Sequence, residues 1–201
     1  MDKYKILIVE DNTELLNEWK RVIEDEGYDV DIAENGKVAL NLWENNIYDL
    51  LLVDLLMGEL NGIELIKIIR EKQQYIQIII ITGVGVNHKL YIDAINMNVF
   101  KCYLKPVDLD TIVDTVKEAL KRRDPVLISL EQLAEENPDE PMLLIGKKNY
   151  TPRQIYNEVR KGTSLGNDFY DGFLKTLTDF EKPSEQSVDD LLGVTEFIKK
   201  H

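Results

Sequence analysis

The stretch Leu50–Gly62, with the sequence LLLVDLLMGELNG, decides the fold. Its leading apolar residues do not alternate with polar ones, a pattern typical of a strand that helices cover on both faces of a parallel sheet. The apolar run ends at one carboxylate, Asp54, and a loop with glycines follows. Ligands of such sheets bind outside the carboxyl ends of the strands, where Asp54 would lie. Taken alone, Asp54 is better explained as a cap of the following loop, so its role depends on the other strands.

Strands and helices alternate on both sides of this stretch. Strands are expected at Lys5–Val9, Tyr28–Ala33, Leu50–Val53, Gln77–Ile81 and about Lys101–Leu104. Helices are expected at about 13–26, 37–45, 62–72, 87–96 and 108–123. This order predicts an α/β fold with a five-stranded parallel doubly wound sheet, flavodoxin-like in type, and right-handed crossovers.

Composition narrows the function classes. The net charge of the 201 residues is −13, and acidic residues outnumber basic ones 23 to 15 in residues 1–124 and 14 to 9 in residues 125–201. Neither part has the basic footprint that binding to a phosphate backbone requires, so nucleic acid is disfavoured as a direct partner. One cysteine and two histidines exclude an internal disulfide and a Cys/His metal site. Without a signal peptide or a long apolar run, the protein is expected to be cytoplasmic, with no membrane partner.

Polar side chains follow four of the five predicted strands. Glu10 and Asp11 follow the first strand, Asp54 the third, Thr82 the fourth and Lys105 the fifth. Carboxylates crowded at one sheet edge repel one another and need a cation. Since no sulfur or imidazole is at hand, Mg²⁺ is the natural choice. The set also suits phosphoryl transfer, with a carboxylate nucleophile and with a metal and a lysine to neutralise the phosphoryl oxygens.

This constellation, over Lys3 to about Arg123, resembles the receiver domain of bacterial two-component response regulators. The resemblance implies that Asp54 accepts a phosphoryl group, as an aspartyl phosphate, from a histidine kinase or a phosphotransfer protein. It also implies a Mg²⁺ site formed by Glu10, Asp11, Asp54 and the backbone carbonyl of Leu56.

The resemblance assigns the remaining site residues as well. Thr82 matches the switch hydroxyl, and Lys105 matches the lysine that binds the phosphoryl oxygens. Pro106 matches a family proline that is preceded by a cis peptide bond. The backbone amides of Leu55 and Gly83 would complete the phosphate-binding site.

The chain departs from the family pattern near the metal site and the following loop. Glu10 stands where aspartate is commoner, and glutamate can still reach a metal. Gly58 stands where proline is usual, which predicts a more mobile loop but leaves Gly62 in place for the next helix.

The fifth strand departs further. The family's aromatic switch residue sits three positions before the lysine, where this chain has Cys102, and Tyr103 is one position closer. Adjacent strand residues face opposite sides, so Tyr103 could act as the switch aromatic only if the strand register is shifted. Cys102 is better explained as a small buried apolar residue than as a redox group.

Two positions bear on the lifetime of an aspartyl phosphate. In the family, the residues two after the aspartate and two after the threonine tune loss of the phosphoryl group, and here they are Leu56 and Val84. Neither side chain can orient an attacking water. The hypothesis is that phosphorylated Asp54 is long-lived. Loss of the phosphoryl group within seconds in Mg²⁺ would contradict it.

The last third of the chain matches no family pattern. Residues 124–141 are expected to form a linker with a short helix near Leu130–Glu136, and residues 142–201 a small, mainly helical output or interaction domain. Its elements are expected to be a short strand or buried turn at Met142–Ile145, helices at Pro152–Lys161 and from about Ser164 to about Phe180, and a final helix from Ser187. Pro152–Lys161 is the candidate recognition helix if this part binds DNA, but the next helix is acidic.

The sequence therefore predicts a response regulator that needs Mg²⁺ for its phosphorylation. It is not expected to be a conventional enzyme, although its receiver assists its own phosphoryl transfer and dephosphorylation. The C-terminal output is expected to be protein interaction or dimerisation, so a homodimer is possible. The alternatives are a DNA-binding transcriptional response regulator, a metal-dependent phosphohydrolase with an aspartyl-phosphate intermediate, and a degenerate receiver that serves only as an interaction module.

Overall fold

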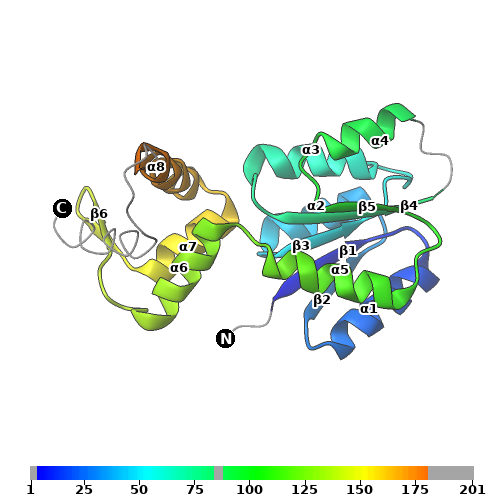
Figure 1. The fold of residues 1–201 in the computed structure, drawn as a ribbon, viewed down its shortest axis with the longest axis horizontal. Coiled ribbons are helices and arrows are strands. Elements are labelled where there is room, and N and C mark those ends of the chain that lie inside the picture. Colours follow the sequence, from blue (N-terminus) through cyan, green and yellow to red (C-terminus); the bar gives the residue numbers. More distant parts are fainter. Residues whose placement is uncertain (1–3, 84–87, 181–201) are drawn as a thin grey trace. The chain divides into compact units, whose positions relative to one another are not determined.

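The computed structural model describes the backbone of residues 4–83 and 88–180 and, within these, the side chains of residues 4–83 and 92–175. The chain divides into two compact units, Met1–Arg123 and Asp124–His201. Each unit has its own arrangement of helices and strands (Figure 1).

The first unit is a five-stranded parallel sheet wrapped by helices, as the sequence predicts. Its strands are β1 (Lys5–Val9), β2 (Asp29–Ala33), β3 (Leu50–Val53), β4 (Gln77–Thr82) and β5 (Lys101–Leu104), in the spatial order β2-β1-β3-β4-β5. Its helices are α1 (Thr13–Asp25), α2 (Gly36–Asn45), α3 (Gly62–Lys72), α4 (His88–Ile95) and α5 (Leu109–Lys121). Figure 1 shows α1 and α5 on one face of the sheet and α2, α3 and α4 on the other. The predicted doubly wound fold is therefore confirmed.

The two-sided cover explains why the apolar run at Leu50–Val53 does not alternate. All four side chains of β3 are fully buried. Leu51 and Val53 pack in the core cluster on the side of α2, α3 and α4, whereas Leu50 and Leu52 pack in the cluster on the side of α1 and α5. Since both faces of a parallel sheet are covered, both sets of positions must be apolar.

Polar side chains fix where the helices around the sheet begin. The N-cap of α1 is Asn12, whose Oδ1 accepts hydrogen bonds from the amides of Glu14 (3.0 Å) and Leu15 (3.2 Å). Asn61 and Glu64 form a reciprocal capping box at the start of α3. These caps satisfy amides that have no partner inside a helix, so they fix where the loops from the strand ends enter the helices.

The second unit contains α6 (Pro125–Glu136), an antiparallel hairpin of β6 (Leu143–Ile145) and β7 (Lys148–Tyr150), α7 (Pro152–Lys161) and α8 (Ser164–Phe180). Where a linker with a short helix is expected, the structure has the longer α6, which packs against α7. A buried apolar stripe on α6 accounts for this helix. The predicted start and stop of α7 agree with the structure, with Thr151 as N-cap and Gly162 as a left-handed C-cap at φ 62°. The helix expected from Ser187 lies outside the described residues.

Candidate functional site

Three carboxylates meet at the carboxyl edge of the sheet, because β1 and β3 are neighbours there. Asp54 donates its amide proton to the carbonyl of Val9 at 2.9 Å, which places the ends of the two strands side by side. One carboxylate oxygen each from Glu10, Asp11 and Asp54 lies within 4.8 Å of the other two. This edge also lies where the strand order reverses, the usual place for a ligand in an open α/β sheet. The structure thus brings together the three acids that the sequence predicts.

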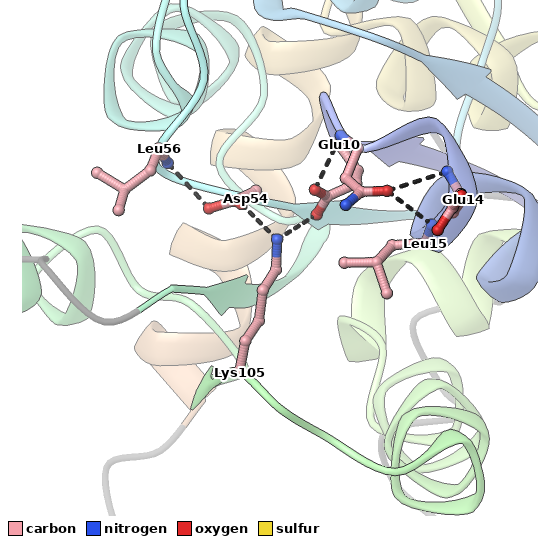
Figure 2. A network of polar contacts seen from close by, with 7 residues as sticks. Glu10, Glu14, Leu15, Asp54, Leu56 and Lys105 are labelled. Carbon is pink, nitrogen blue, oxygen red and sulfur yellow. Dashed lines mark hydrogen bonds and ion pairs between the residues drawn. The ribbon is translucent and has the colours of Figure 1, made fainter.

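Lys105 joins this cluster from the end of β5. Its Nζ donates to Asp54 Oδ2 at 2.5 Å and to Glu10 Oε2 at 2.6 Å (Figure 2). Glu10 and Asp54 are 0% and 3% exposed, whereas Asp11 is exposed. Because two buried carboxylates share one ammonium, this buried edge holds more negative than positive charge.

Backbone amides hold the other oxygens of the two buried carboxylates. The amide of Leu56 donates to Asp54 Oδ1 at 2.9 Å, and the amide of Asn12 donates to Glu10 Oε1 at 3.1 Å (Figure 2). Each carboxylate is therefore fixed in orientation by its own loop and tied to the lysine through its second oxygen. Such fixed, charge-assisted contacts keep a reactive oxygen in a constant position.

Burial and charge act in opposite directions on the ionisation of this cluster. Burial raises the pKa of Glu10, and the hydrogen bond and charge of Lys105 only partly oppose it. For Lys105, burial alone would lower the pKa, but the hydrogen bonds and charges of Asp54 and Glu10 outweigh it and raise the pKa. The lysine is therefore held in its charged form, and the carboxylates favour additional positive charge.

Thr82 lies at the end of β4, next to Lys105. The amide of Lys105 donates to the carbonyl of Thr82 at 2.8 Å. The hydroxyl of Thr82 is fully buried, and within the described part of the chain its Oγ1 has no hydrogen-bond partner. Buried hydroxyls are nearly always paired, so this one is available to an incoming acceptor atom.

The two residues expected to offer backbone amides, Leu55 and Gly83, directly follow Asp54 and Thr82 and so lie at the same edge. Leu56 extends an exposed side chain from the loop after Asp54. Val84, expected to influence the phosphoryl lifetime, lies outside the described residues.

The loop after Asp54 depends on a close backbone approach at Gly62. A Cβ atom on Gly62 would lie 2.2 Å from the carbonyl oxygen of Asp54 and 2.8 Å from Cα of Leu55. No side chain fits there, which explains why glycine begins α3. A Cβ atom at Gly58, by contrast, would meet nothing within 4 Å.

The register of β5 places Tyr103 away from Thr82. Tyr103 is paired with Ile81, packs with the cluster on the α1 and α5 side, and its hydroxyl lies 2.8 Å from Thr115 Oγ1. Cys102, paired with Ile80, packs with the opposite cluster. The register shift that Tyr103 would need to act as the switch aromatic is therefore absent from the described strands.

Trp19 is a site residue that the sequence pattern does not reveal. On α1 it reads as an ordinary core residue, yet Lys105 Nζ lies over its ring, 5.5 Å from the centroid. The contact joins positions far apart in the sequence, so no local pattern could have indicated it. Asn12, by contrast, has a sequence signal, since asparagine before a helical pattern is a strong N-cap.

The donor set fits a hard divalent cation. The three clustered acids offer only oxygen atoms as ligands, and a backbone carbonyl at Leu56 follows on the same loop.

Among the described residues, no helix combines the length and the apolar character that crossing a membrane would require.

Two curated proteins are similar to this chain in sequence. The response regulator ArlR of Staphylococcus saprophyticus is 34% identical over 119 residues, covering 59% of this chain and 53% of ArlR, so the chain spans about half the length of that relative. The probable transcriptional regulator ycf29 of Porphyra purpurea is 31% identical over 163 residues, covering 79% of this chain and 76% of ycf29. The latter match is too long to be confined to the first unit.

Solved structures agree with the sequence matches. The CheY-like receiver domain protein of Methanospirillum hungatei has a TM-score of 0.57 at 28% identity, covering 60% of this chain and 95% of that one. The Francisella response regulator 1452 receiver domain has a TM-score of 0.55 at 28% identity, covering 60% of this chain and 98% of that one. The family model described as the response regulator receiver domain matches residues 6–117. With the acidic edge, the lysine and the doubly wound sheet in place, these matches show that the chain belongs to the response regulator receiver domain family.

Proposed function

We propose that this response regulator accepts a phosphoryl group on Asp54 from a partner histidine kinase or phosphotransfer protein, with Mg²⁺ bound by Glu10, Asp11, Asp54 and the carbonyl of Leu56. One observation carries the proposal: Lys105 contacts the buried Asp54 carboxylate at 2.5 Å within the cluster of three acids. A carboxylate held beside an ammonium and a cation site is equipped to take up a phosphoryl group.

The chain's own residues have distinct tasks in this reaction. One carboxylate oxygen of Asp54 forms a bond to phosphorus while the bond between phosphorus and the donor's imidazole nitrogen breaks, and the electron pair of that bond returns to the nitrogen. Lys105 neutralises charge on the phosphoryl oxygens. The Thr82 hydroxyl, which has no partner among the described residues, donates a hydrogen bond to one of these oxygens. The amides of Leu55 and Gly83 complete the set of donors. Bound at this edge, Mg²⁺ would supply the remaining positive charge.

Replacing the acceptor tests the proposal. In Asp54→Asn, phosphoryl uptake from a small phosphodonor in Mg²⁺ should fall to background, because an amide is not a nucleophile for this reaction. The control is Asp49→Asn, which changes a buried carboxylate at the opposite edge of the sheet, where it accepts a hydrogen bond from the Lys5 amide. This control should retain uptake. Uptake that persists in Asp54→Asn would overturn the assignment.

For the second unit, we favour a protein-interaction or dimerisation output. The hairpin exposes two apolar side chains on its two faces, Leu144 at 64% and Ile145 at 43%, and an association surface would cover one of these faces. Transcription control through DNA is the second candidate. Two observations favour it: the match to ycf29 extends into this unit, and residues 147–161 hold five basic residues against one acidic residue.

A further inference from the structure

The ammonium group of Lys105 contacts an aromatic ring as well as two carboxylates. Beside its contacts with Glu10 and Asp54, Nζ lies over the ring of Trp19, 5.5 Å from the ring centroid. Trp19 comes from α1 and is 3% exposed, within the core cluster on that side of the sheet. The ring is therefore fixed by packing, while the lysine reaches it from the end of β5.

A ring in this position can hold the lysine without competing for a ligand. A cation over an indole face within about 6 Å is attracted by the ring quadrupole, and more strongly where water is excluded. Lys105 is 20% exposed, so the contact is largely shielded from solvent. The attraction has no strict donor direction, unlike a hydrogen bond to a carboxylate. The ammonium can therefore change its hydrogen-bond acceptors while the ring keeps it at the edge of the sheet.

This freedom matters when a phosphoryl group arrives. The N–H groups of Lys105 then have to turn from carboxylate oxygens toward phosphoryl oxygens. A lysine side chain has four flexible carbons, so an ammonium released from the carboxylates would lose its position. We propose that Trp19 is a positioning residue that keeps the Lys105 ammonium at the phosphoryl site throughout this exchange. The inference rests on the proposed phosphoryl acceptance at Asp54.

The test compares variants that remove or weaken the aromatic face. In Trp19→Leu, the affinity for BeF₃⁻ in Mg²⁺ and the rate of phosphoryl uptake should each fall by about five- to ten-fold, the size expected for a shielded cation–π contact. Trp19→Phe keeps a smaller face and should lose less. Affinity for Mg²⁺ alone should not weaken in either variant. The control is Ile23→Ala, a buried residue of the same helix and core cluster, which should lower stability and leave BeF₃⁻ affinity unchanged.

A double substitution separates positioning from structure. In a Lys105→Met background, Trp19→Leu should cause no further loss of uptake rate, because no ammonium remains to be held. An equal loss in both backgrounds, or no loss in Trp19→Leu, would overturn the inference. If Trp19→Leu does not fold, Trp19→Phe in the two backgrounds gives the same comparison. If the unaltered chain takes up neither BeF₃⁻ nor a phosphoryl group, the proposed function itself fails, which is a distinguishable result.

Discussion

Two buried threonine hydroxyls of the first unit differ in their hydrogen-bond partners. The difference indicates which hydroxyl serves the site and which stabilises the fold. Thr115 Oγ1 donates to the carbonyl of Thr111 at 2.7 Å and contacts the hydroxyl of Tyr103. Thr82 Oγ1 has no partner among the described residues. A buried hydroxyl without a partner costs stability, so its presence at the carboxyl edge points to a ligand that completes it.

Valine substitutions at these two positions should therefore act in opposite ways. Thr82→Val should leave the free energy of unfolding unchanged or raise it by about 1 kcal/mol, because it removes an unpaired polar group. It should nevertheless weaken BeF₃⁻ binding. Thr115→Val should lower the free energy of unfolding by about 1–2 kcal/mol and leave BeF₃⁻ binding intact. Denaturant unfolding and anion titration measure both effects, and a large destabilisation by Thr82→Val would contradict the role of its hydroxyl.

At the scale of single residues, the sequence predicts those site positions that the fold itself brings together. Glu10, Asp54 and Lys105 each directly follow a strand, and parallel strands end at one edge, so their proximity follows from the element order. Trp19, by contrast, lies inside α1. Its contact with Lys105 depends on how α1 packs on the sheet, which no local pattern encodes.

The connection from β3 to α3 is the element whose backbone path the site needs most. Gly62→Ala forces a Cβ atom against the carbonyl of Asp54, so the free energy of unfolding should fall by about 1–3 kcal/mol. Phosphoryl uptake should slow as well, because the backbone of the acceptor must shift.

Gly58→Ala is the matched control for this change in the same loop. A Cβ atom at Gly58 meets no neighbouring atom, and this substitution should leave stability unchanged or raise it by up to about 1 kcal/mol. Thermal unfolding and uptake rates measure both variants. Equal effects of the two alanines would show that the close approach at Gly62 has no importance for the site.

Among the elements, the short and acidic ones have the weakest sequence signals. Each strand of the β6–β7 hairpin has only three residues, too few for a periodic signal, and only one of the two strands is indicated by the sequence. The segment of α6 combines a helix pattern with acidic and proline-bracketed surroundings, so its composition suggests a linker. The apolar stripe of α6 is buried in the structure, where α7 packs against this helix, and composition alone does not indicate that contact.

For the whole molecule, phosphorylation should change association through the second unit. Adding BeF₃⁻ and Mg²⁺ should raise the mass in solution, measured by light scattering, if the output is association of two chains. Ile145→Asp, on the exposed hairpin, should then prevent the increase, whereas Asn149→Asp, which is paired with Leu144 and so lies on the other face of the hairpin, should not. Tight DNA binding that weakens steeply with salt, without a change in mass, would favour the DNA-binding candidate instead.

The central claim is that Asp54 is the phosphoryl acceptor of a magnesium-dependent receiver. It is tested most directly by mass spectrometry of the chain after incubation with a small phosphodonor, followed by location of the modification in the peptides. The predicted result is one phosphoryl group on the peptide that contains Asp54, formed in Mg²⁺ and absent when the metal is removed with a chelator before the donor is added. A phosphoryl group on another residue, or none in the presence of Mg²⁺, would contradict the claim.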